Sequence, residues 1–65
     1  MGASLYRELT DRLRAAECEF VREGKGSHEI WRSPITGRHF SVPRNIVSQI
    51  LANTILKQAG LPKAF

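Results

Sequence analysis

His28 is the side chain of this sequence best suited to proton chemistry. An imidazole titrates near neutral pH, so it can act as a general base or a general acid. Residues 24–27, Gly-Lys-Gly-Ser, precede it, and two glycines around a lysine can bring backbone N–H groups and an ammonium up to a phosphate. The simpler interpretation is a hairpin loop that uses glycine for positive φ, followed by a strand histidine that only forms hydrogen bonds. The P-loop spacing is absent.

RNA is a substrate for which one histidine could suffice. Its 2′-hydroxyl is a nucleophile next to the scissile phosphate, so cleavage needs deprotonation of this hydroxyl, protonation of the leaving group and stabilisation of the phosphate charge. His28 could move the protons and Lys25 could neutralise the phosphate. Such chemistry requires no metal ion, and we expect neither a metal nor a cofactor.

Other basic and polar side chains could bind the phosphates of such a substrate. Guanidinium groups suit phosphate because their N–H groups form paired hydrogen bonds. The candidate RNA-binding residues are Lys25, Ser27, Arg32, Arg38 and Arg44. The alternative for each basic residue is a solvated surface charge.

His39 is the second histidine of the chain. Simple strand pairing places it opposite Arg32, which is four residues, or about 13 Å, along the strand from His28. This separation is too large for a shared proton path, so we interpret His39 as a substrate contact or a surface residue. Two histidines without a third ligand also make a poor metal site.

The charges of the chain are unevenly distributed. Ten Lys and Arg against six Asp and Glu give a net charge of +4, and all six acids lie within the first 29 residues. The later basic residues are therefore uncompensated in the sequence, which favours a phosphate-rich or acidic partner.

The length of 65 residues indicates a single domain, residues 1–65, that buries only about 60% of its unfolded surface. Cys18 is the only cysteine, which excludes an internal disulfide and fits a reducing compartment. We find no apolar run long enough to span a bilayer, and residues 1–6 lack the basic-then-apolar order of a signal peptide. These features favour the cytoplasm.

Hydrophobic periodicity and turn residues predict a helix, three strands and a second helix. Ser4 can cap the first helix, and Gly60 can end the second. The strands are expected over 19–23, 28–32 and 39–42, the last helix within 46–59, and the tail 62–65 could fray. The fold class is therefore α+β, with an antiparallel three-stranded sheet.

Simple pairing of Glu23 with His28 and of Arg32 with His39 sorts the sheet into two faces. One face would carry both helices, so that the sheet is covered on one side only. Its expected core residues are Phe20, Trp31, Phe40 and Val42, with Leu51, Ile55, Leu56 and Ala59 from the helix. The expected open face carries Glu23, His28, Arg32, His39 and Ser41 around Val21 and Ile30. A one-residue bulge would change this sorting.

Three segments resemble the HicA family of toxin mRNA interferases: Gly-Ser-His at 26–28 with Ile-Trp at 30–31, Val-Pro-Arg at 42–44, and Ile-Leu-Lys-Gln-Ala-Gly-Leu at 55–61. The chain departs from many relatives at Asn45, where they have histidine, and at Ile50 and Leu51, where they have Gly-Thr. The resemblance implies a compact fold like the double-stranded-RNA-binding domain and RNA cleavage through His28, either dependent on translation or independent of the ribosome. It also implies a type II toxin–antitoxin system in which a HicB-type antitoxin covers the His28 face, and direct DNA binding is not expected of this chain.

Three functions remain open at this point. The first is an endoribonuclease acting on mRNA. The second is a non-catalytic RNA-binding module of the same fold, in which His28 merely contacts phosphate. The third is a protein-interaction domain whose basic face docks an acidic partner.

Overall fold

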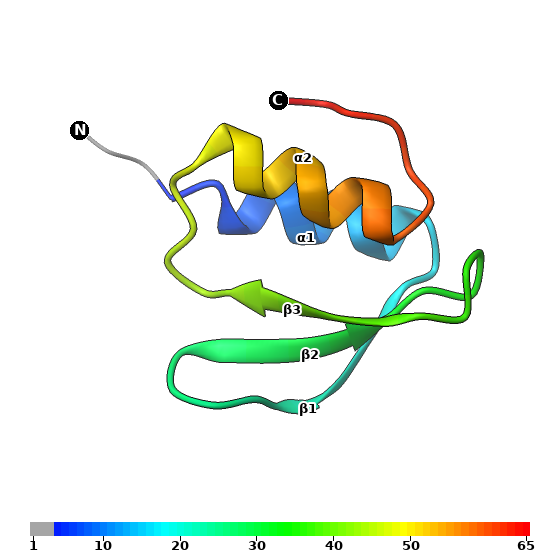
Figure 1. Cartoon of the computed structure of the whole chain (residues 1–65), viewed down its shortest axis with the longest axis horizontal. Helices are drawn as coiled ribbons and strands as arrows, with labels where there is room; N and C mark the ends of the chain where they lie inside the picture. Colours follow the sequence, from blue (N-terminus) through cyan, green and yellow to red (C-terminus); the bar gives the residue numbers. More distant parts are fainter. Residues whose placement is uncertain (1–3) are drawn as a thin grey trace.

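The computed structural model describes residues 4–65 as two helices and a three-stranded antiparallel sheet in the strand order β1-β2-β3 (Figure 1). The elements are α1 (Tyr6–Ala15), β1 (Glu19–Glu23), β2 (His28–Arg32), β3 (His39–Pro43) and α2 (Gln49–Gln58). Both helices lie on the same side of the sheet, and the other side is open (Figure 1). This α-β-β-β-α order confirms the predicted fold class. Residues 1–3, half of the segment used to argue against a signal peptide, lie outside the described residues.

α1 follows from its capping and its apolar stripe. The N-cap residue of α1 is Leu5 and not Ser4 as predicted, but the Ser4 hydroxyl still accepts a hydrogen bond from the Tyr6 backbone N–H at 3.1 Å, which satisfies a donor at the start of the helix. Leu9 and Leu13 are fully buried. Thr10 is also buried, and its hydroxyl is satisfied there because it donates to the Tyr6 carbonyl at 2.8 Å.

The register of the sheet agrees with the prediction at one hairpin and differs at the other. Between β2 and β3, Arg32 pairs with His39, as expected. Between β1 and β2, Phe20 pairs with Trp31, but a bulge follows and Glu23 then pairs with Glu29 instead of His28. The extra residue is Val21, and it shifts every later pair of β1 by one position.

The core lies between the sheet and the helices. Trp31, Phe40 and Val42 are buried as predicted, and so are Ile55, Leu56 and Ala59. Two of the expected core residues are largely exposed: Phe20 at 45% and Leu51 at 42%. Phe20 lies in β1, an edge strand whose five residues are all exposed, and its ring contacts the Trp31 ring edge to face.

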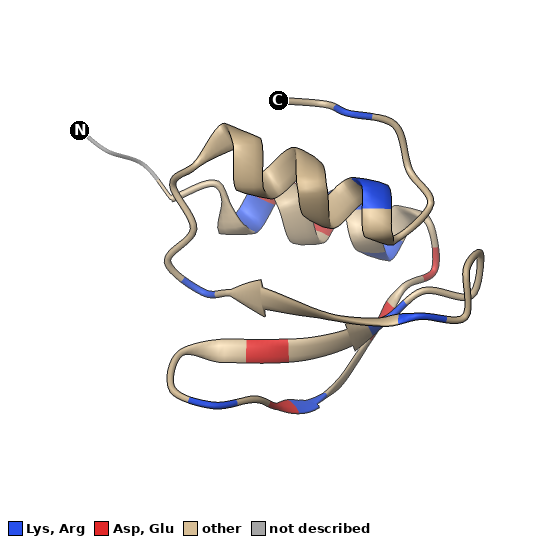
Figure 2. Ribbon diagram, in the orientation of Figure 1, with Lys and Arg blue, Asp and Glu red and all other residues tan. Residues whose placement is uncertain are grey.

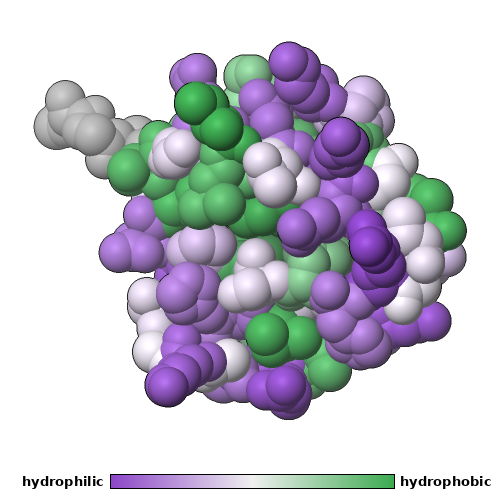
Figure 3. Space-filling view, viewed as in Figure 1, coloured by the Kyte–Doolittle hydropathy of each residue, from purple (hydrophilic) through white to green (hydrophobic). Residues whose placement is uncertain are grey.

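α2 begins and ends at recognisable caps. The Ser48 hydroxyl accepts from the Leu51 backbone N–H at 3.2 Å, and Gly60 adopts φ of 82° after the last turn. The Ser33 hydroxyl donates to the Ala59 carbonyl at 2.7 Å, which fastens the β2–β3 turn to the end of the helix. Exposed apolar side chains lie in the first turn of α2 and two residues before the helix, visible as a green area in Figure 3. They are Val47, Ile50 and Leu51.

The C-terminal tail is held in place, contrary to the expectation that it could fray. The Asn53 carboxamide donates to the Phe65 carbonyl at 3.0 Å and accepts from the backbone N–H groups of Ala64 and Phe65. The Phe65 side chain packs against the core. One polar side chain on α2 therefore holds the backbone of Ala64 and Phe65.

Candidate active site

The β1–β2 loop positions His28 by backbone hydrogen bonds. The Gly24 N–H donates to the His28 carbonyl at 2.8 Å, and the His28 N–H donates to the Lys25 carbonyl at 3.2 Å. Gly26 adopts φ of 64°, so the positive-φ role predicted for a loop glycine is confirmed there. Gly24 is needed for space and not for its φ. An added Cβ would lie 3.2 Å from the His28 carbonyl oxygen and 3.3 Å from Ile30 Cδ1.

The imidazole of His28 is exposed and held at one nitrogen. Its Nδ1 lies 3.1 Å from the carbonyl oxygen of Lys25. A carbonyl oxygen can only accept, so in the neutral ring this contact is a hydrogen bond when Nδ1 carries the proton. Nε2 then presents its lone pair, and it has no partner among residues 4–65. The ring is thus arranged to take a proton at Nε2.

The sequence-predicted residues fall into two groups on the open face. Lys25 and Ser27 are exposed in the loop beside His28. Arg32 is exposed at the other end of β2, and Arg38 is exposed in the turn that follows, with His39 paired to Arg32. Figure 2 shows the corresponding Lys and Arg positions at the two loops of the sheet.

The bulge at Val21 changes the charge of this face. Arg22 pairs with Ile30, so it shares the face of His28, whereas Glu23 is turned to the helix side. An arginine therefore replaces the carboxylate that simple pairing places near the histidine. Sequence reasoning missed Arg22 because the bulge has no signal in the residue types.

Arg44 lies elsewhere than expected. It was expected to be an uncompensated charge beside the open face, but its guanidinium forms ion pairs with Glu23 and with Glu29, the latter through Nε at 3.1 Å. Both carboxylates belong to the helix side of the sheet by register. The pairing joins residues far apart in the chain, so no local pattern indicates it.

Glu29 is a buried carboxylate with donors from three directions. Glu29 is only 7% exposed. The Tyr6 hydroxyl donates to both of its oxygens at 2.9 and 3.0 Å, Trp31 Nε1 donates at 2.9 Å, and Arg44 adds the ion pair. Burial, then the hydrogen bond to Glu29 and the charge of Glu29, raise the pKa of Tyr6 above its ordinary value of 10.0 against smaller effects of Arg14 and Arg44. A possible signal was Glu29 sharing a strand face with Trp31, whose buried N–H needs an acceptor.

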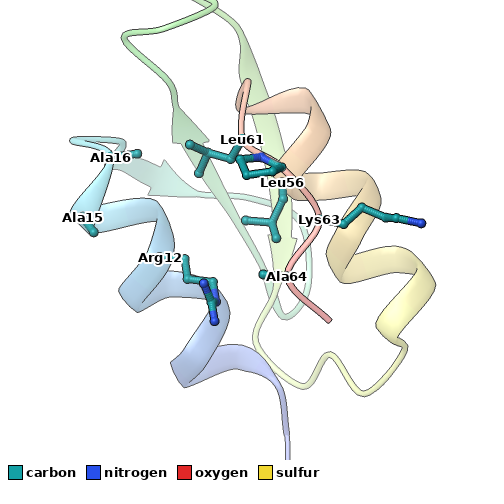
Figure 4. Close-up of a pocket in the computed structure, with 8 residues that line it drawn as sticks. Arg12, Ala15, Ala16, Leu56, Leu61, Lys63 and Ala64 are labelled. Atoms are coloured by element: carbon teal, nitrogen blue, oxygen red, sulfur yellow. The ribbon is translucent and has the colours of Figure 1, made fainter.

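Other candidate sites are weak in the described part of the chain. Residues 4–65 contain no group of three His, Cys, Asp or Glu side chains placed to hold a metal ion. A shallow, mostly apolar hollow of about 300 Å³ lies between α1, Leu56 and the C-terminal tail (Figure 4). None of the predicted site residues lines it. Neither helix described here has the length and apolar character needed to cross a membrane.

Fold and site together define a small α+β protein with an exposed, loop-held histidine at the start of its central strand. The family model described as HicA toxin of bacterial toxin–antitoxin matches residues 6–61, from the first residue of α1 to just beyond Gly60. The chain therefore belongs to the HicA toxin family, whose members are generally RNA-cleaving toxins and whose partner is a HicB antitoxin. No curated protein and no solved structure matches it.

Proposed function

We propose that this chain is a metal-independent endoribonuclease that cleaves mRNA in the cytoplasm with His28 as its acid and base. The observation that carries the proposal is the held imidazole. Nδ1 is engaged by the Lys25 carbonyl, and Nε2 is free to receive a proton on the open face. Family membership supports RNA as the substrate class.

The reaction balances with one histidine. Nε2 takes the proton of a 2′-hydroxyl, whose oxygen forms a bond to the adjacent phosphorus while the bond from phosphorus to the 5′-oxygen breaks. The imidazolium so formed can return that proton to the departing 5′-oxygen. The products are a 2′,3′-cyclic phosphate and a 5′-hydroxyl end. DNA is not cleaved, because it lacks the nucleophile.

The phosphate charge is met by side chains of the same face. Lys25 lies three residues before the histidine in an exposed loop, where its ammonium could neutralise the reacting phosphate, and the Ser27 hydroxyl can donate to it. Arg32 and Arg38 lie at the far end of β2, where they can bind a neighbouring part of the strand of RNA. Arg44 is the fifth residue that the sequence predicted to bind phosphate, but its guanidinium already has two carboxylate partners.

The proposal is tested by incubating the purified chain with a long RNA, with and without a chelator, and with DNA of the same sequence. We expect chelator-resistant cleavage of RNA only, which weakens as salt is added because phosphate attraction is screened. Loss of cleavage in chelator that a divalent ion restores contradicts the mechanism. Retention of intact RNA identifies the non-catalytic binding module, and inertness toward RNA identifies the protein-interaction domain.

The HicB antitoxin expected from the family is proposed to cover the His28 face. Arg22, Lys25 and Arg32 give this face a positive charge that acidic groups of a partner can meet. A complex in which these residues stay exposed would contradict the blocking mechanism.

A further inference from the structure

The buried charge of Glu29 needs a reason beyond stability. A carboxylate taken out of water is costly, and exchanging a buried ion pair for apolar side chains is often neutral or stabilising. Here the carboxylate lies on the covered side of the sheet, where Glu29 pairs with Val42 and is buried together with Trp31. The network that Glu29 forms lies next to His28 in the chain.

Arg44 holds both chain neighbours of His28. Its backbone N–H donates to the Ser27 carbonyl at 3.0 Å, which continues the pairing of β2 with β3 beyond His28 and Pro43. Its guanidinium pairs with Glu29 on the other side of the histidine. The link to Glu23 then ties the same guanidinium to the last residue of β1, where the loop to His28 begins.

The hydrogen bond of the imidazole depends on this backbone. The Lys25 carbonyl that holds Nδ1 belongs to the loop between Glu23 and His28. The imidazole is attached to the backbone between Ser27 and Glu29. Arg44 fixes both ends of that loop. A shift at either end changes the distance from Nδ1 to the carbonyl and with it the direction in which Nε2 points.

We propose that Glu29 and Arg44 are positioning residues for His28, and that Arg44 acts through this ion-pair network and not as a phosphate ligand. The inference rests on the proposed function, because it assumes that His28 transfers protons. Tyr6 and Trp31 complete the network by donating to Glu29 from the helix side.

Two substitutions separate positioning from RNA binding. Arg44→Lys keeps the charge and the backbone bond to Ser27 but removes the fork that reaches two carboxylates. Glu29→Gln keeps the size and one acceptor oxygen, but it removes the negative charge of the ion pair and turns the second acceptor into an NH₂ donor. Arg7→Lys is the matched control: Arg7 is exposed on α1, outside the proposed site.

The first readout is RNA cleavage at saturating protein. We expect both variants to lower the saturated rate about tenfold or more, because small misplacements of a catalytic group are costly. The protein concentration giving half-saturation should change by less than about threefold, and Arg7→Lys should match the wild type in both. A higher half-saturating concentration with an unchanged saturated rate would instead make Arg44 a phosphate ligand and overturn the proposal.

The second readout does not need activity. Ring-nitrogen chemical shifts from NMR report which nitrogen of His28 carries the proton, with His39 as the only other histidine and an internal reference. We expect the Nδ1–H form in the wild type and a mixture of tautomers in both variants. Unchanged tautomers in folded variants overturn the positioning role, even if the wild type fails to cleave RNA and the proposed function falls. If Glu29→Gln does not fold, the test rests on Arg44→Lys alone. This variant should fold, because the Arg44 side chain is 41% exposed.

Discussion

His28 and Glu29 are adjacent in the chain, yet their side chains occupy opposite faces of β2 and have opposite environments. His28 is exposed and has one nitrogen free, whereas Glu29 is buried and every donor it needs is supplied. Strand alternation is the cause, since successive residues point to opposite faces. An exposed imidazole and a buried, fully hydrogen-bonded carboxylate can therefore lie next to each other in so short a chain.

The loop lysine gives the first prediction at the residue scale. Lys25→Ala should lower RNA cleavage roughly tenfold, since one charge-assisted contact to a phosphate is worth about 1.5 kcal/mol. The fold should survive because the side chain is exposed. Cleavage rates and melting temperatures check both parts. An unchanged rate at low salt would show that Lys25 does not contact the phosphate.

A second prediction concerns Tyr6, the only tyrosine of the chain. Its raised pKa means that the folded state holds the hydroxyl proton more tightly than the unfolded state does. Stability should therefore fall as the pH rises from 10.0, the ordinary tyrosine pKa, toward the raised pKa.

Tyrosinate absorbance measures this titration directly, because no other tyrosine contributes. In Glu29→Gln the midpoint should move down toward the ordinary value, since Glu29 both accepts the hydrogen bond and supplies the negative charge. A midpoint that stays unchanged in the folded variant would show that burial alone raises the pKa of Tyr6.

The residues of the loop and of the ion-pair network differ in how far sequence could predict them. Lys25, Ser27 and His28 are consecutive or nearly so, and a hairpin necessarily keeps them together. Arg44 and Glu29 are 15 residues apart, and their pairing depends on how β3 leaves the sheet. The sequence therefore indicated the proposed catalytic residue but not the residues proposed to position it.

At the scale of elements, a single inserted residue decides which charges face the histidine. The bounds of β1, residues 19–23, were predicted correctly. The bulge at Val21 was not predicted, because no residue type in the strand, such as a glycine, indicates it. The β2–β3 register had no such insertion, and there simple pairing was right. The bounds of β1 and β2 were thus readable from the pattern, β3 extends one residue beyond the predicted 39–42 to Pro43, and the register of the edge strand β1 was not readable.

The cap of α2 gives a prediction for two glycines with positive φ. Gly60→Ala should cost clearly more stability than Gly26→Ala, for which about 1 kcal/mol of backbone strain is expected. At Gly60 an added Cβ would lie 2.8 Å from Ile35 Cγ2, whereas nothing lies within 4 Å at Gly26. Urea unfolding measures both free energies. Equal losses would mean that the β2–β3 turn yields without cost and does not fasten α2.

At the scale of the whole molecule, two helices protect one face of a three-stranded sheet and leave the other for a partner or a substrate. The helices bury residues of β2 and β3 but none of β1, so the edge strand contributes little to the core. This explains why periodicity predicted Trp31 and Phe40 correctly and Phe20 wrongly. Periodicity indicates which face a residue shares but not how far the helices extend over that face.

The same asymmetry predicts unequal effects of two aromatic truncations. Trp31→Ala should cost about 3–5 kcal/mol, enough to unfold a domain of marginal stability. Phe20→Ala should cost about 1 kcal/mol or slightly more, because the ring is 45% exposed and loses mainly its contact with Trp31. Thermal unfolding followed by circular dichroism distinguishes them. Equal melting temperatures for wild type and Trp31→Ala would contradict the assignment of the sheet faces.

The central claim is that an exposed, loop-held His28 cleaves RNA, and its most direct test is the cleavage rate of purified His28→Ala. We expect a loss of about 100-fold or more with a melting temperature close to that of the wild type, because the side chain moves protons and lies outside the core. His39→Ala, the same change at the far end of the sheet, should lose far less. Full cleavage of RNA by purified His28→Ala would contradict the account.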